Sequence, residues 1–122
     1  MAVALQIFSY SRCSTCRKAI SWLKSKNINY KLIDIIETPP SKDTLVKALN
    51  QLGDRKYLFN TSGKSYRAIG AASIRRMSDD DVIKLLASDG KLIKRPFVIN
   101  NDGRIITGFN QLSWEELFLS LK

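Results

Sequence analysis

The stretch that decides the fold is Val3-Ala4-Leu5-Gln6-Ile7-Phe8, which leads after a short turn into Cys13-Ser14-Thr15-Cys16-Arg17-Lys18. The first stretch is an apolar run and predicts a buried strand. From Ser14 to Lys26 apolar residues recur at helical spacing with lysines opposite them, which predicts an amphipathic helix. Both cysteines of the chain therefore lie at the junction between a strand and a helix.

This junction favours thiol redox chemistry. The thiol of Cys13 comes beside the free amides at the start of the helix, whose partial positive charge favours the reactive thiolate over the thiol. Cys16 follows one helical turn later, close enough to attack a mixed disulfide formed by Cys13. We therefore predict that Cys13 and Cys16 are the catalytic pair.

Composition limits the kind of protein. With 122 residues, 44% of them hydrophobic, residues 1–122 are expected to form one domain around a single core. We find neither a run of about 20 apolar residues nor a secretory signal, so we expect a cytoplasmic protein. In that reducing compartment a cysteine pair is more often catalytic, regulatory or metal-binding than a permanent disulfide. Two cysteines and no histidine do not supply the ligands of a structural zinc site, so no metal or bound cofactor is expected.

The charge of the chain points to anionic partners. Twenty Lys and Arg stand against eleven Asp and Glu, which gives a net charge of +9. Such a surface attracts small oxyanions or acidic protein faces. The positive charges are spread along the chain without a basic tract, so we expect neither direct DNA binding nor membrane association. The missing histidine also excludes Ser-His-Asp and Cys-His nucleophiles.

The middle of the chain continues as a βαβ unit and then becomes helical. Residues 30–36 read as a second strand, which a helical crossover would make parallel to the first. Ser41 can cap a helix that stops at Gly53, and further helical segments follow to about residue 90. We therefore expect a helical insert at about 41–90.

The end of the chain predicts a hairpin and a helix. Residues 97–99 and 104–107 read as strands joined by the turn Asn101-Asp102-Gly103. Ser113-Trp114-Glu115-Glu116 has the form of a capping box that opens a last helix. The complete order is βαβ, a helical insert, and ββα, which with a CxxC after the first strand is typical of a thioredoxin-like fold.

In that fold a proline opens the third strand and packs opposite the thiols. Pro96, in Lys94-Arg95-Pro96-Phe97, stands at this position. We therefore predict a cis peptide bond between Arg95 and Pro96 and a structural role for Pro96 at the site.

The chain resembles the arsenate reductase (ArsC)/Spx family, which also contains the MgsR regulators. The resemblance covers nearly the whole chain and implies a thioredoxin-like (glutaredoxin-like) mixed sheet, α/β in class, with a helical insert between the second and third strands. It is carried by these segments, which fall in order: Cys13-Ser14-Thr15-Cys16-Arg17-Lys18, Leu58-Phe59-Asn60-Thr61-Ser62-Gly63-Lys64, Leu92-Ile93-Lys94-Arg95-Pro96 and Gly108-Phe109-Asn110.

The resemblance also implies roles for particular residues. Cys13 takes the nucleophile position, and Arg95 matches an arginine that holds the oxyanion in arsenate reductases, where guanidinium groups also lower the thiol pKa. Lys64 stands where those reductases carry another arginine, and a further arginine that they carry near Gly108-Phe109 is absent here. The basic residues expected to attract an anionic partner are Arg12, Arg17, Lys64 and Arg95.

Three functions remain open. In the first, Cys13 forms a mixed disulfide that Cys16 resolves, with glutathione, thioredoxin or another protein as redox partner. In the second, the pair is a redox switch like that of the Spx and MgsR branch, whose members bind the RNA polymerase α C-terminal domain; Gly53 lies near the position of a glycine used in that contact. The third is arsenate reduction, although the glutaredoxin-coupled reductases have no cysteine at the position of Cys16.

Overall fold

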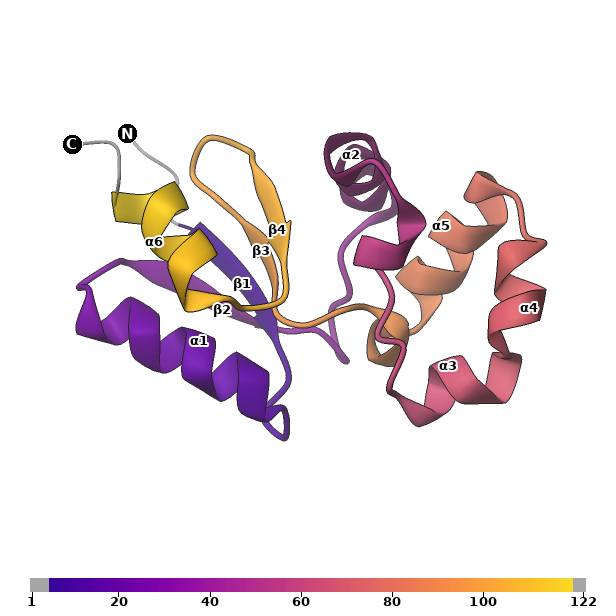
Figure 1. Ribbon diagram of the computed structural model, residues 1–122, viewed down its shortest axis with the longest axis horizontal. Coiled ribbons are helices and arrows are strands. Elements are labelled where there is room, and N and C mark those ends of the chain that lie inside the picture. The colour runs from indigo at the N-terminus through magenta and orange to yellow at the C-terminus, as the bar shows by residue number, and fades with distance from the viewer. Residues whose placement is uncertain (1–4, 120–122) are drawn as a thin grey trace.

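A computed structural model describes residues 5–119 and shows a mixed sheet with helices on both faces (Figure 1). Within this range the strands are β1 (Leu5–Ser9), β2 (Tyr30–Asp34), β3 (Phe97–Ile99) and β4 (Ile105–Thr107), in the spatial order β2-β1-β3-β4. β1 is parallel to β2 and antiparallel to β3, and β4 is antiparallel to β3. The predicted parallel pair and hairpin are confirmed; Val3 and Ala4 of the predicted first strand lie outside the described residues.

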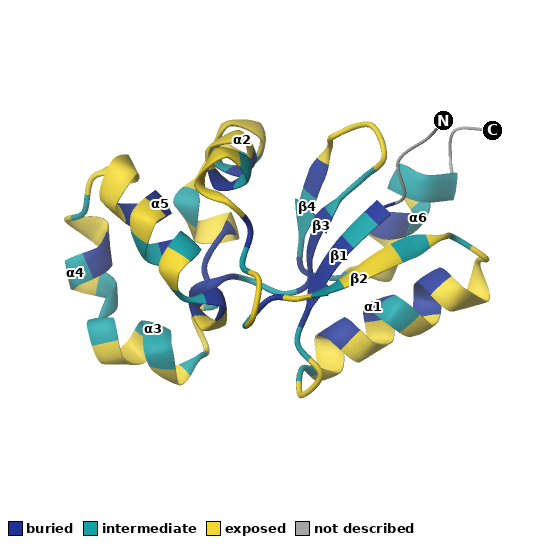
Figure 2. Cartoon of the chain, turned by 180° about the vertical axis from the view of Figure 1, so that it is seen from behind, coloured by how far each residue is buried: buried dark blue, intermediate teal, exposed yellow. Residues whose placement is uncertain are grey.

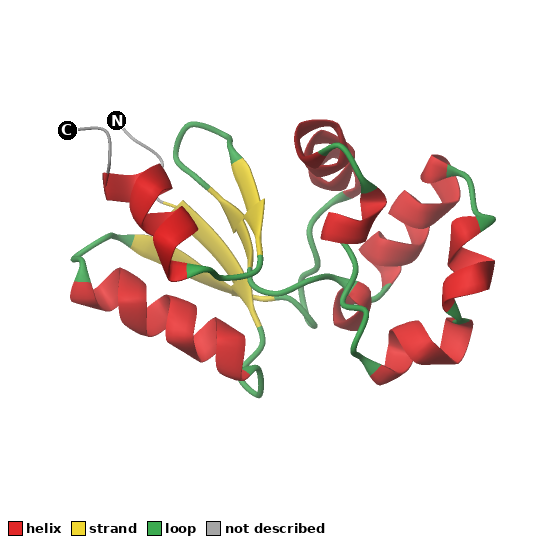
Figure 3. Cartoon of the chain, viewed as in Figure 1, coloured by secondary structure: helices red, strands yellow, loops and turns green. Residues whose placement is uncertain are grey.

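The helices divide into two groups (Figures 1 and 3). α1 (Ser14–Ser25) and α6 (Gln111–Leu119) lie together on one side of the sheet. All the other helices come between β2 and β3, which confirms the helical insert. We call residues 42–92 the helical insert; it contains α2 (Lys42–Leu52), η1 (Arg55–Tyr57), α3 (Lys64–Ile69), α4 (Ala71–Arg75), α5 (Asp79–Ser88) and η2 (Gly90–Leu92).

The two inner strands, β1 and β3, bury both of their faces, and Figure 2 shows their buried residues between the two groups of helices, whereas the edge strand β2 has no buried residue. Side chains alternate along a strand. Ile7 and its strand partner Val98 therefore pack under α1 and α6, whereas Phe8 and Phe97 pack against the helical insert. The Phe8 and Phe97 rings meet edge to face at 5.7 Å.

An aromatic cluster fills the layer under α1 and α6. Trp114 is 1% exposed, and its ring lies 5.8 Å from that of Trp22, 4.9 Å from that of Phe109 and 5.5 Å from that of Phe118. Both tryptophans are thus core residues. Within the described residues, neither indole Nε1 has a hydrogen-bond partner, so the rings contribute through apolar burial and ring contacts.

Two boundaries differ from the sequence predictions by more than one residue. β2 ends at Asp34 instead of continuing to residue 36, because the Asp34 carboxylate accepts the Ile36 amide at 2.8 Å and turns the chain. The capping box at Ser113 is wrong. The side chain of Asn110 accepts the Ser113 amide at 3.0 Å, so α6 begins at Gln111 and Ser113 lies inside its first turn.

The helical insert joins the sheet through close backbone contacts. Gly90 packs so tightly on the end of β2 that a Cβ there would lie 1.9 Å from the carbonyl oxygen of Ile35. Phe59 and Ile93 form an isolated antiparallel bridge. The Lys94 amide donates to the Leu58 carbonyl at 2.8 Å beside it. Residues 58–60 are thereby aligned with the chain that leads into β3.

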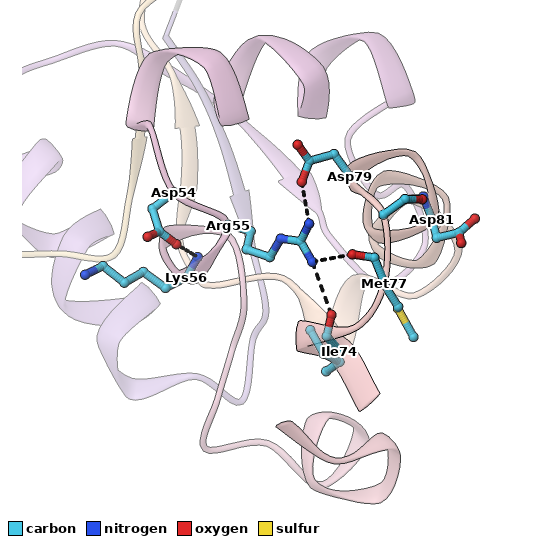
Figure 4. A network of polar contacts seen from close by, with 8 residues as sticks. Asp54, Arg55, Lys56, Ile74, Met77, Asp79 and Asp81 are labelled. Carbon is cyan, nitrogen blue, oxygen red and sulfur yellow. Dashed lines mark hydrogen bonds and ion pairs between the residues drawn. The ribbon is translucent and has the colours of Figure 1, made fainter. Parts of the chain in front are cut away.

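Arg55 connects η1 to the far side of the helical insert (Figure 4). Its guanidinium donates to the carbonyls of Ile74 at 3.1 Å and Met77 at 2.9 Å, and it pairs with the Asp79 carboxylate at 2.5 Å. The acidic first turn of α5 therefore does more than complement the helix N-terminus, because one of its carboxylates also pairs with Arg55 of η1.

Candidate thiol redox site

Cys13 lies at the point where β1 gives way to α1. Its amide donates to the carbonyl of Tyr10 at 3.0 Å, which closes the turn after the strand. Its Sγ caps the helix by accepting the amide of Cys16 at 3.3 Å. The sulfur is thus held at the helix N-terminus, where free amides favour negative charge. Cys13 is partly exposed, whereas Cys16 is fully buried beneath it.

The pKa values of the two thiols shift in opposite directions. Burial raises the pKa of the Cys13 thiol, but hydrogen bonds from the thiol and the amide of Cys16, together with the charge of Arg95, outweigh it and leave the pKa below its usual value. Burial and the hydrogen bond to Cys13 raise the pKa of Cys16 to about 11. Of the two thiols, Cys13 is therefore the one that ionises first as the pH rises, whereas Cys16 keeps its proton at neutral pH.

Arg95 and Pro96 approach the thiols from the start of β3. The Arg95-Pro96 peptide bond is cis, as predicted, and Pro96 is buried. The Arg95 guanidinium stacks over the Tyr10 ring at 5.1 Å from its centroid and contacts the Lys91 carbonyl at 3.5 Å. Because the Tyr10 carbonyl also accepts the Cys13 amide, the ring that supports Arg95 belongs to the turn that positions Cys13.

A cleft of about 790 Å³ opens beside Cys13. It lies where α1, the start of α6, the β4 end and the helical insert meet. Its cations are Lys56, Lys94 and Arg95, and no Asp or Glu is among the described residues that line it: Cys13, Ser14, Thr15, Lys56, Phe59, Asn60, Thr61, Ser62, Gly63, Lys94, Arg95, Ile106, Thr107, Gly108, Phe109, Asn110, Ser113 and Trp114.

The sequence-predicted basic residues fall in different places. Arg95 lines the cleft together with Cys13. Arg12 is exposed in the turn before α1, and Arg17 donates to the Ser11 carbonyl at 2.7 Å on the outer side of that helix. Lys64 is exposed as the first residue of α3. None of these three lines the cleft, so the structure brings only Arg95 to the thiol.

Sequence reasoning did not single out Lys56 and Lys94 as site residues. Lys94 directly precedes Arg95 and Pro96, so its position beside these two residues could have marked it as a site residue. Lys56 reaches the cleft only because residues 58–60 pair with the chain around Ile93, a contact between segments about thirty residues apart. A single sequence carries no local signal for that pairing.

Among residues 5–119, no three Cys, Asp or Glu side chains gather as metal ligands would. The same residues include no helix with the length and apolar character needed to cross a bilayer.

The mixed sheet, the CxxC at the start of α1 and the cis-proline directly before β3 define a thioredoxin-like protein with a dithiol site. A family model described as the ArsC family matches residues 8–117. The chain belongs to the ArsC family, and its fold and CxxC pair make it an arsenate reductase-related protein of that family.

Curated relatives include two kinds of regulatory protein. YusI of Bacillus subtilis (strain 168) is 42% identical over 93% of this chain and 98% of that protein. The global transcriptional regulator Spx of Streptococcus pyogenes serotype M3 is 27% identical over 86% of this chain and 78% of its own length. The regulatory protein MgsR of Bacillus subtilis (strain 168) is also 27% identical, over 90% of this chain and 86% of its own length.

Solved structures confirm the thioredoxin-like fold. A crystal structure described as a possible arsenate reductase from Streptococcus mutans UA159 has a TM-score of 0.83 at 39% identity, over 91% of this chain and 94% of that one. A structure described as ArsC family related, from Bacteroides fragilis, has a TM-score of 0.86 at 35% identity, over 96% of this chain and 99% of that one. Both alignments span the sheet and the helical insert.

Proposed function

We propose that this ArsC-family protein is a thiol–disulfide oxidoreductase in which Cys13 attacks and Cys16 resolves. One observation carries the proposal: a partly exposed thiol of lowered pKa faces a basic cleft, and it accepts a hydrogen bond from a buried thiol that keeps its proton. This difference separates the roles of the two sulfurs, since the thiolate is the attacking species.

The reaction proceeds in two exchanges. The Cys13 thiolate attacks one sulfur of a disulfide, the S–S bond of that substrate breaks, and one thiolate leaves. The Cys16 thiol then attacks the Cys13 sulfur, its proton passes to the second leaving thiolate, and an internal Cys13–Cys16 disulfide forms. The substrate gains two electrons and the protein dithiol loses two. Glutathione or thioredoxin, which the cytoplasm supplies, is the reductant that restores the dithiol.

A trapping experiment tests these roles. Cys16→Ser removes the resolving thiol, so a mixed disulfide on Cys13 should accumulate with oxidised glutathione and be visible as a mass increase. Cys13→Ser should give no such adduct, because the remaining thiol is buried and protonated. Adduct formation in Cys13→Ser at the rate seen in Cys16→Ser would contradict the roles assigned to the two cysteines. No adduct in either variant would reject the function.

A regulatory role is the second candidate, favoured by the likeness to Spx and MgsR over most of the chain. In this role the same disulfide would switch binding to the RNA polymerase α C-terminal domain. Gly53, which ends α2 with a φ of 83°, lies near the position of a glycine that serves this contact in Spx. Titration of the reduced and oxidised protein against that domain decides the matter: no binding in either state removes the role.

Arsenate reduction is a third candidate, because Arg95 accompanies the Cys13 thiol in the cleft. An arsenate oxygen could be held by this guanidinium while the thiolate attacks arsenic. Arsenate-dependent turnover with glutathione or thioredoxin should then be lost in Cys13→Ser and in Arg95→Ala. Absence of turnover in the unmutated protein with both reductants would dispose of this activity.

A further inference from the structure

The cleft beside Cys13 has an unbalanced charge. Three cations line it, and the described lining residues include no carboxylate. Within the part of the chain that the structure describes, the one salt bridge is that of Arg55 with Asp79, so Lys56 and Lys94 have no anionic partner there. Basic side chains gathered in a concave site without counter-charges attract anions, and this cleft is also lined by Cys13.

The backbone of Lys56 is held in place by its neighbours, and its ammonium lies 5.2 Å from the centroid of the Tyr57 ring. Asp54 caps η1 by accepting the Lys56 amide at 2.8 Å, and Arg55 ties the same turn to α4 and α5. Figure 4 shows the side chains of Arg55 and Lys56 leaving η1 in opposite directions. Arg55 uses its charge inside the helical insert, whereas the Lys56 side chain lines the cleft.

Lys94 comes to the cleft from the other side. Its amide donates to the Leu58 carbonyl, so its backbone is held against the helical insert. Its side chain crosses Gly108 at the end of β4, where an added Cβ would lie 3.0 Å from the lysine Cε. The absence of a side chain at Gly108 therefore leaves the room through which the Lys94 stem passes.

The size of the cleft indicates what kind of anion it takes. A volume of about 790 Å³ falls in the range of roughly 300–1,000 Å³ that is usual for organic ligands. Hydroxyl and amide groups also line it, including those of Thr15, Asn60 and Asn110. A single oxyanion would leave most of this space unused, whereas a short peptide with carboxylates would fill it.

We propose that Lys56 and Lys94 are specificity-determining residues that bind the carboxylates of a small anionic peptide disulfide while its sulfur meets Cys13. This inference rests on the proposed thiol–disulfide function and names its substrate class. The lysines take no part in the bond changes: the dithiol reduces the substrate disulfide by two electrons and becomes the Cys13–Cys16 disulfide, as described above. Their effect is to select anionic over uncharged disulfides.

The test compares two disulfides with three double variants. The reduced protein is mixed with oxidised glutathione, which is anionic, or with hydroxyethyl disulfide, which is uncharged, and formation of the protein disulfide is followed by acid quench and mass spectrometry. Lys56→Gln/Lys94→Gln removes the cleft charges. Lys47→Gln/Lys84→Gln removes equal charge from exposed positions outside the cleft. Lys56→Arg/Lys94→Arg keeps the charge.

The quantity measured is the ratio of the two rate constants, anionic over uncharged. In Lys56→Gln/Lys94→Gln this ratio should fall about tenfold, since the loss of two solvent-accessible ion pairs lowers a rate constant by about a factor of ten. It should stay at the wild-type value in the Lys47 and Lys84 variant and recover in the arginine variant. An unchanged ratio in the glutamine cleft variant, or an equal fall in the outer variant, overturns the proposal. Failure of the wild type to react with either disulfide rejects the thiol–disulfide function itself.

Discussion

The two regions that meet at the cleft differ in what they supply. The sheet module, which comprises residues 5–34 and 97–119, contributes the reactive sulfur and the helix N-terminus that activates it. The helical insert contributes Lys56 and the polar residues 60–63, which line the cleft without touching the reacting atoms in our scheme. The difference teaches that the placement of the two thiols is set by local chain geometry, whereas the rest of the cleft lining, Arg95 included, depends on contacts between distant segments.

The largest expected effect lies in the sheet module. Trp114→Ala should lower the free energy of unfolding by about 4 kcal/mol, because it empties a fully buried position inside an aromatic cluster. Trp114→Phe should cost only about 1 kcal/mol, because within the described residues its indole N–H has no hydrogen-bond partner to lose. Urea denaturation measures both. Equal losses in the two variants would show that the N–H has a partner that stabilises the fold.

The next effect falls on the junction between the two regions. Gly90→Ala should cost about 3 kcal/mol, since the new methyl group meets the backbone of Ile35 and one of the two segments must move. Lys91→Ala is the neighbouring control, because the Lys91 side chain is exposed. A Gly90→Ala protein as stable as Lys91→Ala in urea would mean that the sheet module and the helical insert are not locked together at this point.

A smaller effect is expected inside the helical insert. Arg55→Met should cost about 2 kcal/mol, because it leaves the Ile74 and Met77 carbonyls without their donor. Asp79→Asn should cost less than about 1 kcal/mol, since the Asp79 side chain is 66% exposed. The same urea experiment, with hydrogen exchange at residues 74–77, measures both variants. If Asp79→Asn were the more damaging change, the ion pair and not the carbonyl contacts would hold η1.

The smallest effect concerns the acidity of the nucleophile. Arg95→Met should raise the pKa of Cys13, because the thiolate loses a hydrogen-bond donor and a positive charge. Iodoacetamide alkylation of Cys13 should then reach half its maximal rate at a higher pH and be slower at neutral pH. Arg75→Met, on the exposed side of α4, serves as the control. An alkylation profile that does not move in Arg95→Met would assign the lowered pKa to Cys16 and the helix alone.

Much of the sheet module could be predicted from the sequence because its signals are local. The apolar run ending at Phe8, the CxxC and the turn Asn101-Asp102-Gly103 each act within a few residues, and each predicted element is present. The cis bond before Pro96 followed from the order of elements. The cap of α6 was assigned wrongly because Asn110 and Ser113 are both good capping residues, and the competition between them is settled by where the chain leaves β4.

The basic lining of the cleft could be predicted only in part. Arg95 was found because it adjoins the proline, but Lys56 depends on the bridge between Phe59 and Ile93 and on the Arg55 contacts, which join segments far apart in the sequence. Arg12, Arg17 and Lys64 were close to the right segments, yet the direction of each side chain is set by helix and turn geometry. Their part in binding anions stays a prediction.

The burial of Cys16 beneath Cys13 has a consequence for oxidative damage. Peroxide would convert the accessible Cys13 thiolate to a sulfenic acid, the first product of an oxidation series whose later products, the sulfinic and sulfonic acids, form irreversibly. The Cys16 thiol already contacts that sulfur and can condense with the sulfenic acid, releasing water. The result is again the internal disulfide, which a reductant can open, so the buried thiol protects its neighbour from permanent loss.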